Sequence, residues 1–261
     1  MEGKHQMVKV LILRVAGTNC DLETEWAFKL AGANPERVHI NEIVKGKKKL
    51  KDYQILAIPG GFSYGDDIGA GKVLANEIRY KIWDQIEDFI KEKKPIIGIC
   101  NGFQVLVKSG ILPWNSEQTV TLGWNDSGRF EDRWVYLKVE ESVCKFTEGL
   151  PEIIRLPVAH SEGKFIPKSD KVLQKLKRKK QIVFRYVSPD GKISGYPYNP
   201  NGSVDNIAGI CDEEGIILGM MPHPERCLLK FHYPDWTRME ESVEYGIGFK
   251  IFEKMVKYVS S

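Results

Sequence analysis

Cysteine is scarce in this sequence, and its spacing argues against two common uses of the residue. Five cysteines occur among 261 residues, and no two of them form a C-x-x-C pair. An odd number at wide spacing argues against a disulfide framework and against a structural zinc site. The pattern is typical of a reducing compartment, so we expect a cytoplasmic protein. The five are Cys20, Cys100, Cys144, Cys211 and Cys227.

Long hydrophobic runs are also missing. No apolar stretch approaches the roughly 18 residues that a membrane span requires. The first ten residues, MEGKHQMVKV, contain no apolar core of a signal peptide. We therefore expect no membrane association. Charge of one sign does not dominate either, because 38 basic and 35 acidic residues leave a net charge of +3. So small an excess does not favour binding to nucleic acid.

Strand-like and helix-like segments alternate through the first half of the chain. Strands are predicted where apolar residues run together or alternate, at 8–15, 37–43, 53–58 and 95–99. Helices are predicted at 19–32, 73–93 and 101–109. The first of these takes Asn19 as its N-cap and ends at Gly32.

This order predicts an α/β fold whose mostly parallel sheet is covered by helices on both faces. In such sheets ligands bind at the carboxyl ends of the strands, where Gly60, Gly61 and Cys100 are expected. Length and composition favour one domain over residues 1–261, and we expect residues 1–7 to be flexible.

The second half of the chain differs in character. Strands and turns with many aromatic residues are predicted at 119–139, 153–165 and 181–187, and a helix at 168–180. Residues 196–204 read as a loop rich in proline, glycine and asparagine. A hairpin is predicted over 207–211 and 216–221, followed by a closing helix at 240–258.

The segment Gly98-Ile99-Cys100-Asn101-Gly102 stands where a predicted strand runs into a predicted helix. Glycines on both sides of a cysteine permit the tight turn of a nucleophile elbow, which lifts the side chain above the sheet. The sulfur then lies at a helix N-terminus, where the dipole favours a thiolate. The amide of Asn101 faces the place where an oxyanion would form. A buried structural cysteine is the alternative, but the paired glycines favour a nucleophile.

His223 and Glu225 follow an apolar strand, two residues apart. In extended backbone their side chains point the same way. The carboxylate can then orient the imidazole, as in a catalytic triad. An isolated H-x-E pair is equally typical of a surface turn. Beside an elbow cysteine, it predicts a triad of Cys100, His223 and Glu225.

A third segment, PGGFSYGDD at 59–67, places two glycines at a strand end. Gly60 and Gly61 let backbone amides approach a ligand closely, so they can supply a second oxyanion donor. A phosphate-binding loop of the form G-x-x-x-x-G-K-[ST] is excluded, because Asp66 stands at its first position and Val73 at its last.

Together, GICNGFQ and the distant PHPE resemble the class I (triad) glutamine amidotransferases. The strings PGGFSYGDDIGAGK, AHSEGKF, YPYNPNGSVDNIAGI and MMPHPER narrow the resemblance to the PurQ family. These are the glutaminase subunits of phosphoribosylformylglycinamidine synthase in purine biosynthesis. The likeness covers residues 8 to 226 and resumes in the last helix.

The resemblance implies a flavodoxin-like amidotransferase domain that hydrolyses glutamine to glutamate and ammonia through a cysteine thioester. By motif, Cys100 is the nucleophile, His223 the base, and Glu225 the group that orients His223. The motifs place five further residues at the substrate, with Gly61 and Asn101 as oxyanion donors and Gln104 and His160 near the amino-acid end. The five are Gly60, Gly61, Asn101, Gln104 and His160.

The resemblance also implies partners. Ammonia passes to a separate synthetase subunit of the PurL type, usually together with a small subunit of the PurS type. No metal or organic cofactor is implied for glutamine hydrolysis. ATP and magnesium are expected in the synthetase subunit.

The chain departs from the family pattern in two places. It has His160-Ser161-Glu162-Gly163-Lys164 where the family has His-Gly-Glu-Gly-Arg. The segment 227–246 is longer and more aromatic than the family pattern. We interpret it as an insertion that contacts another subunit, and a surface excursion without such a contact is the alternative.

Two other functions fit parts of the pattern. A cysteine hydrolase or a glyoxalase-like enzyme can use a similar elbow, but no histidine stands directly after Cys100. A regulatory subunit that kept the fold without activity would not need an intact triad. Release of glutamate and ammonia from glutamine distinguishes the amidotransferase from both.

Overall fold

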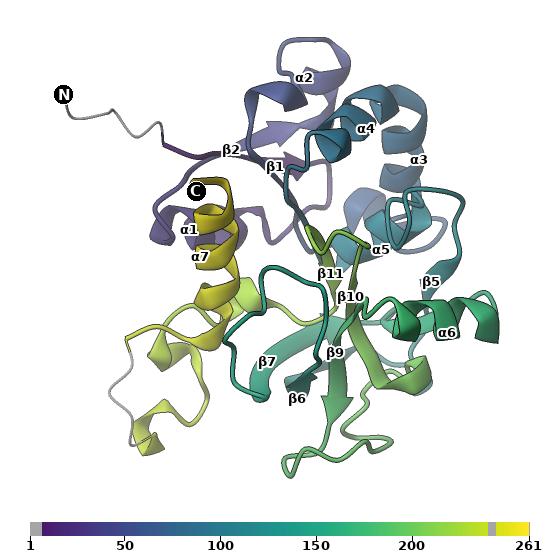
Figure 1. The fold of residues 1–261 in the computed structure, drawn as a ribbon, viewed down its shortest axis with the longest axis vertical. Coiled ribbons are helices and arrows are strands. Elements are labelled where there is room, and N and C mark those ends of the chain that lie inside the picture. Colours follow the sequence, from purple (N-terminus) through teal and green to yellow (C-terminus); the bar gives the residue numbers. More distant parts are fainter. Residues whose placement is uncertain (1–6, 240–243, 261) are drawn as a thin grey trace.

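The structure, a computed structural model, describes residues 7–239 and 244–260. A central twisted sheet runs through the molecule, with helices packed on both of its faces (Figure 1). Nine strands form it in the order β2-β1-β3-β4-β11-β10-β9-β6-β7, and β5 pairs separately with β8. The strands are β1 (Lys9–Arg14), β2 (Asn34–His39), β3 (Ile55–Ile58), β4 (Ile96–Ile99), β5 (Val120–Gly123), β6 (Glu131–Val139), β7 (Ile153–His160), β8 (Lys164–Pro167), β9 (Ile182–Val187), β10 (Ile207–Cys211) and β11 (Ile217–Met220).

Five neighbouring strands, β2, β1, β3, β4 and β11, run parallel. Strands β3, β4 and β11 are buried along their whole length, as expected when helices cover both faces. The remaining four strands extend the sheet in antiparallel fashion. Because parallel strands end at one edge of a sheet, the segments that follow β1, β3, β4 and β11 meet there.

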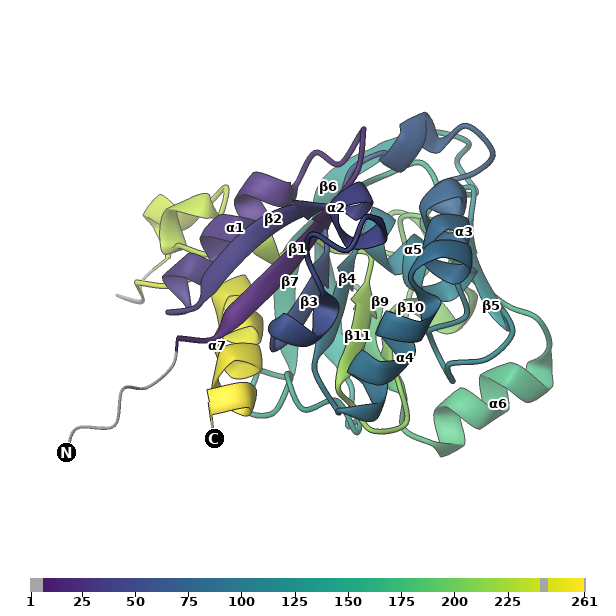
Figure 2. The same cartoon turned by 90° about the horizontal axis from the view of Figure 1, so that it is seen from above.

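The helices form two layers, one on each face of the sheet (Figure 2). Helices α1 and α7 pack together on one face, where the rings of Phe28 and Phe252 meet edge to face with centroids 5.0 Å apart. Helices α3, α4 and α5 lie on the other face. The helices are α1 (Asp21–Leu30), α2 (Ile40–Val44), α3 (Lys72–Lys81), α4 (Trp83–Lys91), α5 (Asn101–Lys108), α6 (Asp170–Arg178) and α7 (Ile247–Ser260).

The two helix layers and the sheet share one hydrophobic core, which extends from Val8 to Val256. The single domain expected over residues 1–261 stays a prediction, and residues 1–6 of the segment expected to be flexible lie outside the described part. Among the helices that the structure describes, none is both long and apolar enough to cross a membrane.

The predicted strand at 37–43 is wrong in its second half. Strand β2 ends at His39, and residues 40–44 form the short helix α2. The ring of His39 caps this helix, because its Nδ1 accepts a hydrogen bond from Asn41 N at 3.1 Å. The helical turn buries both Ile40 and Ile43, which strand alternation would not do. The apolar pattern of these residues therefore belongs to a helix.

The long helix predicted at 73–93 is in fact two helices, α3 and α4. They meet at the buried Ile82, whose φ and ψ of −137° and 16° are not helical. Isoleucines recur every four residues here, and four residues turn an ideal helix about 40° beyond one full turn. A straight helix would therefore rotate the later isoleucines away from the core, whereas with the break at Ile82 the residues Ile78, Ile82 and Ile86 are all buried.

Two other helix ends also differ from the prediction. The N-cap of helix α1 is Cys20 rather than Asn19, and the amides of both residues donate to Gly60 O, at 3.2 and 3.3 Å. The closing helix α7 begins at Ile247 rather than at residue 240. Residues 240–243 of the predicted helix lie outside the described residues.

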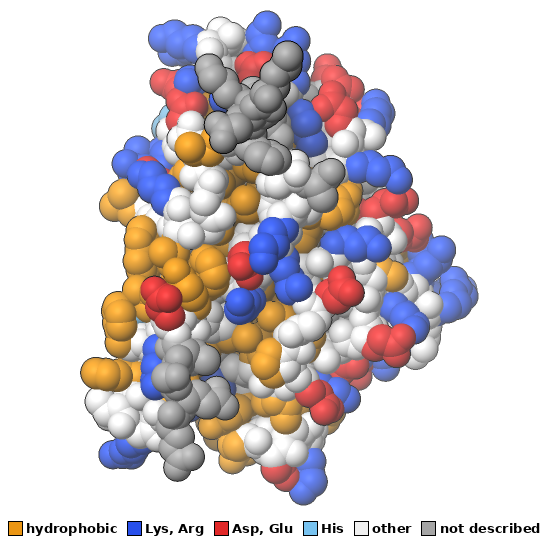
Figure 3. Space-filling view, turned by 60° about the vertical axis from the view of Figure 1, so that its left-hand side comes forward, with side chains coloured by type: hydrophobic (Ala, Val, Ile, Leu, Met, Phe, Trp, Pro, Cys, Tyr) orange, Lys and Arg blue, Asp and Glu red, His pale blue; other side chains and the backbone are white. Residues whose placement is uncertain are grey.

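The segment 227–246 includes two short 3-10 turns, Lys230–His232 and Trp236–Arg238. Arg155 holds it to the sheet by donating two hydrogen bonds to Asp235, at 2.7 and 3.0 Å. Hydrophobic side chains gather on this side of the molecule (Figure 3), and Phe231 and Trp236 are exposed there. The interpretation of this segment as a subunit contact stays a prediction.

Candidate active site

Cys100 lies in a sharp turn between β4 and α5. Its φ of 52° and ψ of −105° are uncommon for a residue with a side chain. Its amide donates to Met220 O at 2.8 Å, and its thiol lies 3.6 Å from Ala159 O. A Cβ on Gly102 would lie only 1.8 Å from Ile58 O. Only glycine therefore allows α5 to approach β3 this closely, as a nucleophile elbow requires.

His223 and Glu225 follow β11, the strand next to β4. Nδ1 of His223 lies 2.6 Å from Oε1 of Glu225, and each residue is only 1% exposed. The expected extended backbone is wrong, because residues 224–226 form a 3-10 turn. The turn still brings the two side chains together. The amide of His223 is fixed by Pro157 O at 2.8 Å.

The electrostatics of His223 favour the charged imidazole. Burial by itself lowers the pKa of His223, but the carboxylate of Glu225 and the sulfur of Cys100 outweigh burial and raise this pKa well above its ordinary value. Nε2 of His223 and Oε2 of Glu225 have no hydrogen-bond partner among the described residues. Leaving a buried polar atom unpaired costs about 1–3 kcal/mol. The site therefore keeps one donor or acceptor on each residue free for reacting atoms.

Because Gly60 has no side chain, the imidazole of His223 and the side chain of Cys100 can both approach it closely. A Cβ on Gly60 would lie 2.8 Å from Cε1 of His223 and 3.5 Å from Cβ of Cys100. The next residue, Gly61, has no recorded acceptor for its amide among the described residues. Asn101 opens α5, so its amide has no acceptor within the helix. The two amides predicted as oxyanion donors are thus available.

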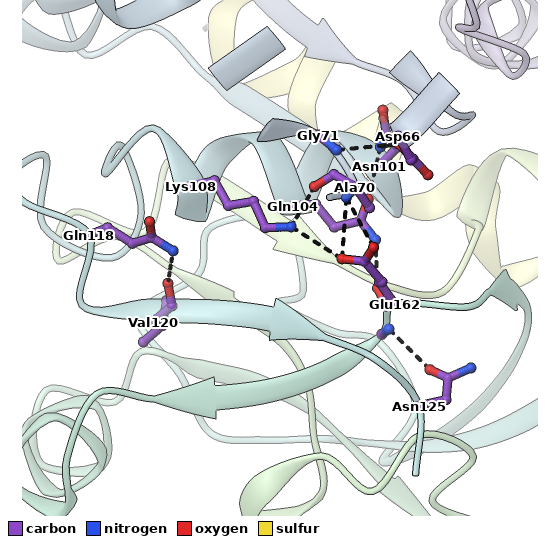
Figure 4. Close-up of polar contacts among 11 residues, drawn as sticks. Asp66, Ala70, Gly71, Asn101, Gln104, Lys108, Gln118, Val120, Asn125 and Glu162 are labelled. Carbon is purple, nitrogen blue, oxygen red and sulfur yellow. Dashed lines mark hydrogen bonds and ion pairs between the residues drawn. The ribbon is translucent and has the colours of Figure 1, made fainter. Parts of the chain in front are cut away.

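On the other side of Cys100, polar side chains bond to one another (Figure 4). Asn101 donates from Nδ2 to Gln104 Oε1 at 2.8 Å, and Gln104 donates from Nε2 to Glu162 O. Oδ1 of Asn101 accepts from Ser63 N at 3.2 Å. Gln104 lines the cavity beside Cys100, but both ends of its amide are engaged within the protein.

A buried ion pair closes this side. The carboxylate of Glu162 accepts from Ala70 N, at 3.1 and 3.2 Å, and contacts Lys108 Nζ at 3.3 Å. Lys108 also donates to Ala70 O at 2.6 Å. Burial lowers the pKa of Lys108, although Glu162 opposes the shift. The loop after β3 is therefore fastened to α5 and to the loop after β7 (Figure 4).

His160 lies inside the wall of the cavity. Its Nδ1 contacts Oδ1 of Asn125 at 3.1 Å, and its Nε2 contacts Nδ2 of Asn201 at 3.5 Å. These partners suit a neutral ring. Burial and the neighbouring His223 lower the pKa of His160 to about 3. The ring packs beneath Gly163, where a Cβ would lie 2.4 Å from it. The ring nitrogens thus support the loop, although the residue borders the cavity predicted to hold substrate.

The cavity beside Cys100 has a volume of about 240 Å³. The residues that line it come from the loops after β3, β5 and β7, from the end of β7 itself, from the turn after β4 and from α5. They are Gly61, Phe62, Gly65, Asp66, Ala70, Cys100, Gln104, Trp124, Ala159, His160, Ser161 and Glu162.

Sequence reasoning missed Cys20, Arg226, Lys108 and Glu162. Cys20 is buried, and Nη2 of Arg226 donates to its sulfur at 3.1 Å. Cys20, His223 and Glu225 bring potential metal-ligand atoms within 4.8 Å of one another. A signal for Cys20 existed, because it follows β1 just as Gly60 and Cys100 follow their parallel strands. No local pattern in the sequence indicates the pairing of Lys108 with Glu162.

Comparison with known proteins places the chain among amidotransferases. Residues 7–259 match the model of the CobB/CobQ-like glutamine amidotransferase domain. The chain is 51% identical to the phosphoribosylformylglycinamidine synthase subunit PurQ of Dehalococcoides mccartyi, over 96% of this chain and 97% of that protein. It is 46% identical to the same subunit of Methanococcus maripaludis, over 89% and 87% of the two chains.

A solved structure agrees with these relatives. The chain resembles a chain of the PurLQS structure from Thermotoga maritima with a TM-score of 0.74 and 30% identity, over 97% of this chain and 99% of that one. The expected α/β fold, with its largely parallel sheet and two helix layers, is thereby confirmed.

Proposed function

The chain belongs to the CobB/CobQ-like glutamine amidotransferase family, and within it to the PurQ subunits of phosphoribosylformylglycinamidine synthase; on this premise we propose how it hydrolyses glutamine. The reaction yields glutamate and ammonia, and the ammonia is used in purine biosynthesis. The observation that carries the proposal is the position of the His223–Glu225 pair directly beside the elbow cysteine, across Gly60.

The first half-reaction forms a thioester. The thiolate of Cys100 attacks the carboxamide carbon of glutamine, and the carbonyl electrons move to oxygen, where the amides of Gly61 and Asn101 hold the oxyanion. When the carbonyl re-forms, the C–N bond breaks. The imidazolium of His223 gives its proton to the departing nitrogen, and ammonia leaves. Its raised pKa keeps His223 charged until that transfer.

The second half-reaction regenerates the enzyme. Neutral His223 takes a proton from water, and the resulting hydroxide attacks the glutamyl thioester carbon. The C–S bond breaks, glutamate leaves, and Cys100 returns as the thiolate. Glu225 orients the ring of His223 through Nδ1 and stabilises its charged form in both steps. No metal or organic cofactor is needed for this sequence.

Ammonia made at this site has to reach an acceptor. In the proposal a PurL-type synthetase subunit receives it and carries the ATP and magnesium of the ligation step, with a small PurS-type subunit in the assembly. The PurLQS structure of a relative supports a synthetase partner. The exposed aromatic segment at 227–239 is a proposed contact with one of these subunits.

The partner is also expected to switch the site on. The second oxyanion donor, Gly61, opens a loop in which Tyr64 and Asp66 both hold a φ of 56°. The ion pair of Glu162 with Lys108 fastens the far end of this loop, at Ala70, and docking of a partner can shift the glycine-bearing end that carries Gly61. A misplaced oxyanion donor costs about 10²–10³ in rate. We therefore expect glutaminase activity to rise by that factor on assembly.

The test is a glutaminase assay that measures both glutamate and ammonia. The purified chain is assayed alone, then with the synthetase subunit, ATP, magnesium and the small subunit. The proposal predicts slow hydrolysis alone and fast hydrolysis in the complex. Full activity of the isolated chain would refute the switching idea only. No glutamate release in any mixture would refute the glutaminase assignment.

A further inference from the structure

The peptide between Gly60 and Gly61 is held in one orientation by the N-terminus of α1. Gly60 O accepts hydrogen bonds from the amides of Asn19 and Cys20, at 3.3 and 3.2 Å. The peptide is trans, so its N–H points away from its carbonyl oxygen. Gly61 also lines the cavity beside Cys100. The two amides at the start of α1 therefore fix the direction of the N–H of Gly61, the second oxyanion donor.

The segment that carries these amides, residues 16–20, interlocks with the loop after β3. The amide of Phe62 donates to Gly17 O at 2.8 Å. A Cβ on Gly17 would lie 2.0 Å from Phe62 O, and one on Gly61 would lie 2.5 Å from Asn19 N. Because no side chain fits at either glycine without a shift of backbone, the two segments have to move together. Gly17 and Asn19 are exposed, so a docking subunit that shifts Gly61 acts on both segments.

One side chain ties this segment to the catalytic pair. Nη2 of Arg226 donates to the sulfur of Cys20 at 3.1 Å, and Cys20 is only 1% exposed. Arg226 directly follows Glu225 in the 3-10 turn Pro224–Arg226, and its amide donates to His223 O at 3.3 Å. The contact therefore joins the turn that carries the catalytic carboxylate to the segment that directs the oxyanion donor.

We propose that Cys20 and Arg226 are positioning residues for glutamine hydrolysis, because their contact fixes the direction of the Gly61 amide. The inference rests on the proposed function, in which that amide holds the oxyanion. Neither residue is among those that line the cavity, so both act through Gly61 rather than on the substrate. A misplacement of about 1 Å can cost about 100-fold in rate. Loss of the contact is therefore expected to lower kcat by about 10–100-fold, less than outright loss of a donor.

Cys20 also lies close to the base, which gives it a competing role. A Cβ on Gly60 would lie 3.2 Å from the sulfur of Cys20 and 2.8 Å from Cε1 of His223. The two roles differ in their pH dependence. A thiol that acts on His223 shifts the pH profile of kcat when it is removed, because that profile reports the pKa values of the acid and the base. A thiol that positions Gly61 lowers kcat by the same factor at every pH.

The first test measures kcat and KM for glutamine in the chain assembled with its synthetase subunit. Arg226→Met keeps the length of the side chain but removes the hydrogen bond. It is expected to lower kcat by about 10–100-fold and to change KM by less than about threefold, because an oxyanion donor acts on the transition state. Arg226→Lys can still donate and should recover most of the rate. Arg185→Met removes another paired arginine and should keep the wild-type kcat.

Substitutions of Cys20 test the other end of the contact. Cys20→Ser keeps an acceptor for Arg226 and should retain most of the rate. Cys20→Ala should lose as much kcat as Arg226→Met, with an unchanged pH profile. The double variant Cys20→Ala with Arg226→Met should lose no more than either single variant, because each change breaks the same contact. Additive losses, or a shifted pH profile in Cys20→Ala, would overturn the inference.

The second test uses the aldehyde analogue of glutamine, in which CHO replaces the carboxamide. The thiolate of Cys100 adds to the aldehyde carbon, and the carbonyl electrons move to the oxygen, which occupies the place of the oxyanion. The inhibition constant is therefore expected to rise in Arg226→Met by the factor by which kcat falls. Wild-type kcat or wild-type inhibition in Arg226→Met would overturn this inference alone. No glutamate release by the wild-type complex would instead refute the proposed function.

Discussion

The two sides of Cys100 differ in how completely their buried polar groups are hydrogen-bonded. On the catalytic side, His223 and Glu225 share one hydrogen bond, and each keeps one buried atom without a partner in the part of the chain that the structure describes. On the substrate side, Gln104, Glu162 and Lys108 satisfy one another (Figure 4). The unpaired atoms of the catalytic side are available to form hydrogen bonds with the reacting atoms. The polar groups of the substrate side bond to one another, and these bonds fix the positions of the loops that form the cavity beside the sulfur of Cys100.

Substitutions on the two sides should therefore have different effects, on the rate of glutamine hydrolysis or on the stability of the fold. A change on the catalytic side should lower the rate far more than the stability, because its unpaired atoms do not stabilise the fold and His223 can become neutral when it loses its carboxylate partner. A change on the substrate side should first remove stability, because its groups are buried and mutually paired. Four substitutions test this difference between loss of rate and loss of stability.

Cys100→Ala is expected to abolish glutamine-dependent activity. The elbow turn stays, but no nucleophile remains to form the thioester. Synthesis by the assembled complex with added ammonia should continue, because the acceptor site lies in another subunit. Cys227→Ala is the matched control, since that thiol is buried near His223 in sequence but lies outside the cavity. Glutamine hydrolysis that persists in Cys100→Ala would place the nucleophile elsewhere.

Glu225→Gln is expected to lower kcat by about 10⁴, as loss of the orienting carboxylate does in other triads. The amide keeps the size of the side chain but no longer stabilises the charged ring. The melting temperature of this variant should fall less than that of Glu162→Gln, because His223 can lose its proton and become neutral when the carboxylate is gone. A large fall in melting temperature with near-normal kcat would show that Glu225 stabilises the fold and does not act in catalysis.

Glu162→Gln is expected to cost about 3–5 kcal/mol of unfolding free energy, because it leaves the charge of Lys108 buried without a partner. Denaturant unfolding measures the loss. The double variant Glu162→Gln with Lys108→Met should recover most of it, since both charges are then gone. If the single and double variants lose the same stability, the unpaired charge of Lys108 is not the cause of the loss.

His160→Gln is expected to flatten the dependence of stability on pH. The pKa of His160 is about 3 in the folded chain and roughly 6.5 when unfolded. The unfolded state therefore binds the extra proton in this range, and stability falls by about 1.4 kcal/mol for each pH unit below 6.5. Denaturant unfolding between pH 4 and 6.5 compares the slopes. Equal slopes in the two proteins would show that His160 does not titrate on unfolding.

The sequence was sufficient where the signal is local. The elbow at Cys100 follows from its flanking glycines, and His223 with Glu225 follows from two residues of separation. Parallel strands were predicted from apolar runs. Helix α2 was missed because short apolar patterns fit a strand or a helix equally well. The break at Ile82 was missed because the local pattern is helical on both sides of it, and burial of the later side chains decides where the helix bends.

The remaining parts of the site depend on contacts between distant segments. Arg226 and Cys20 are 206 positions apart, and Lys108 and Glu162 are 54 apart. Nothing in either neighbourhood specifies the partner. The strand order brings the ends of β1 and β11 to one edge and so pairs Cys20 with Arg226, whereas Lys108 at the end of α5 meets Glu162 in the loop after β7.

One labelling experiment tests the central claim most directly. The chain is treated with a diazo-ketone analogue of glutamine, and the adduct is located by intact mass and peptide mapping. The account predicts one adduct per chain on Cys100, protection by glutamine, and slow labelling in Glu225→Gln. Cys20 is the informative competitor, because it is a second thiol close to His223. An adduct on Cys20, or on any cysteine other than Cys100, would contradict the assignment of the nucleophile.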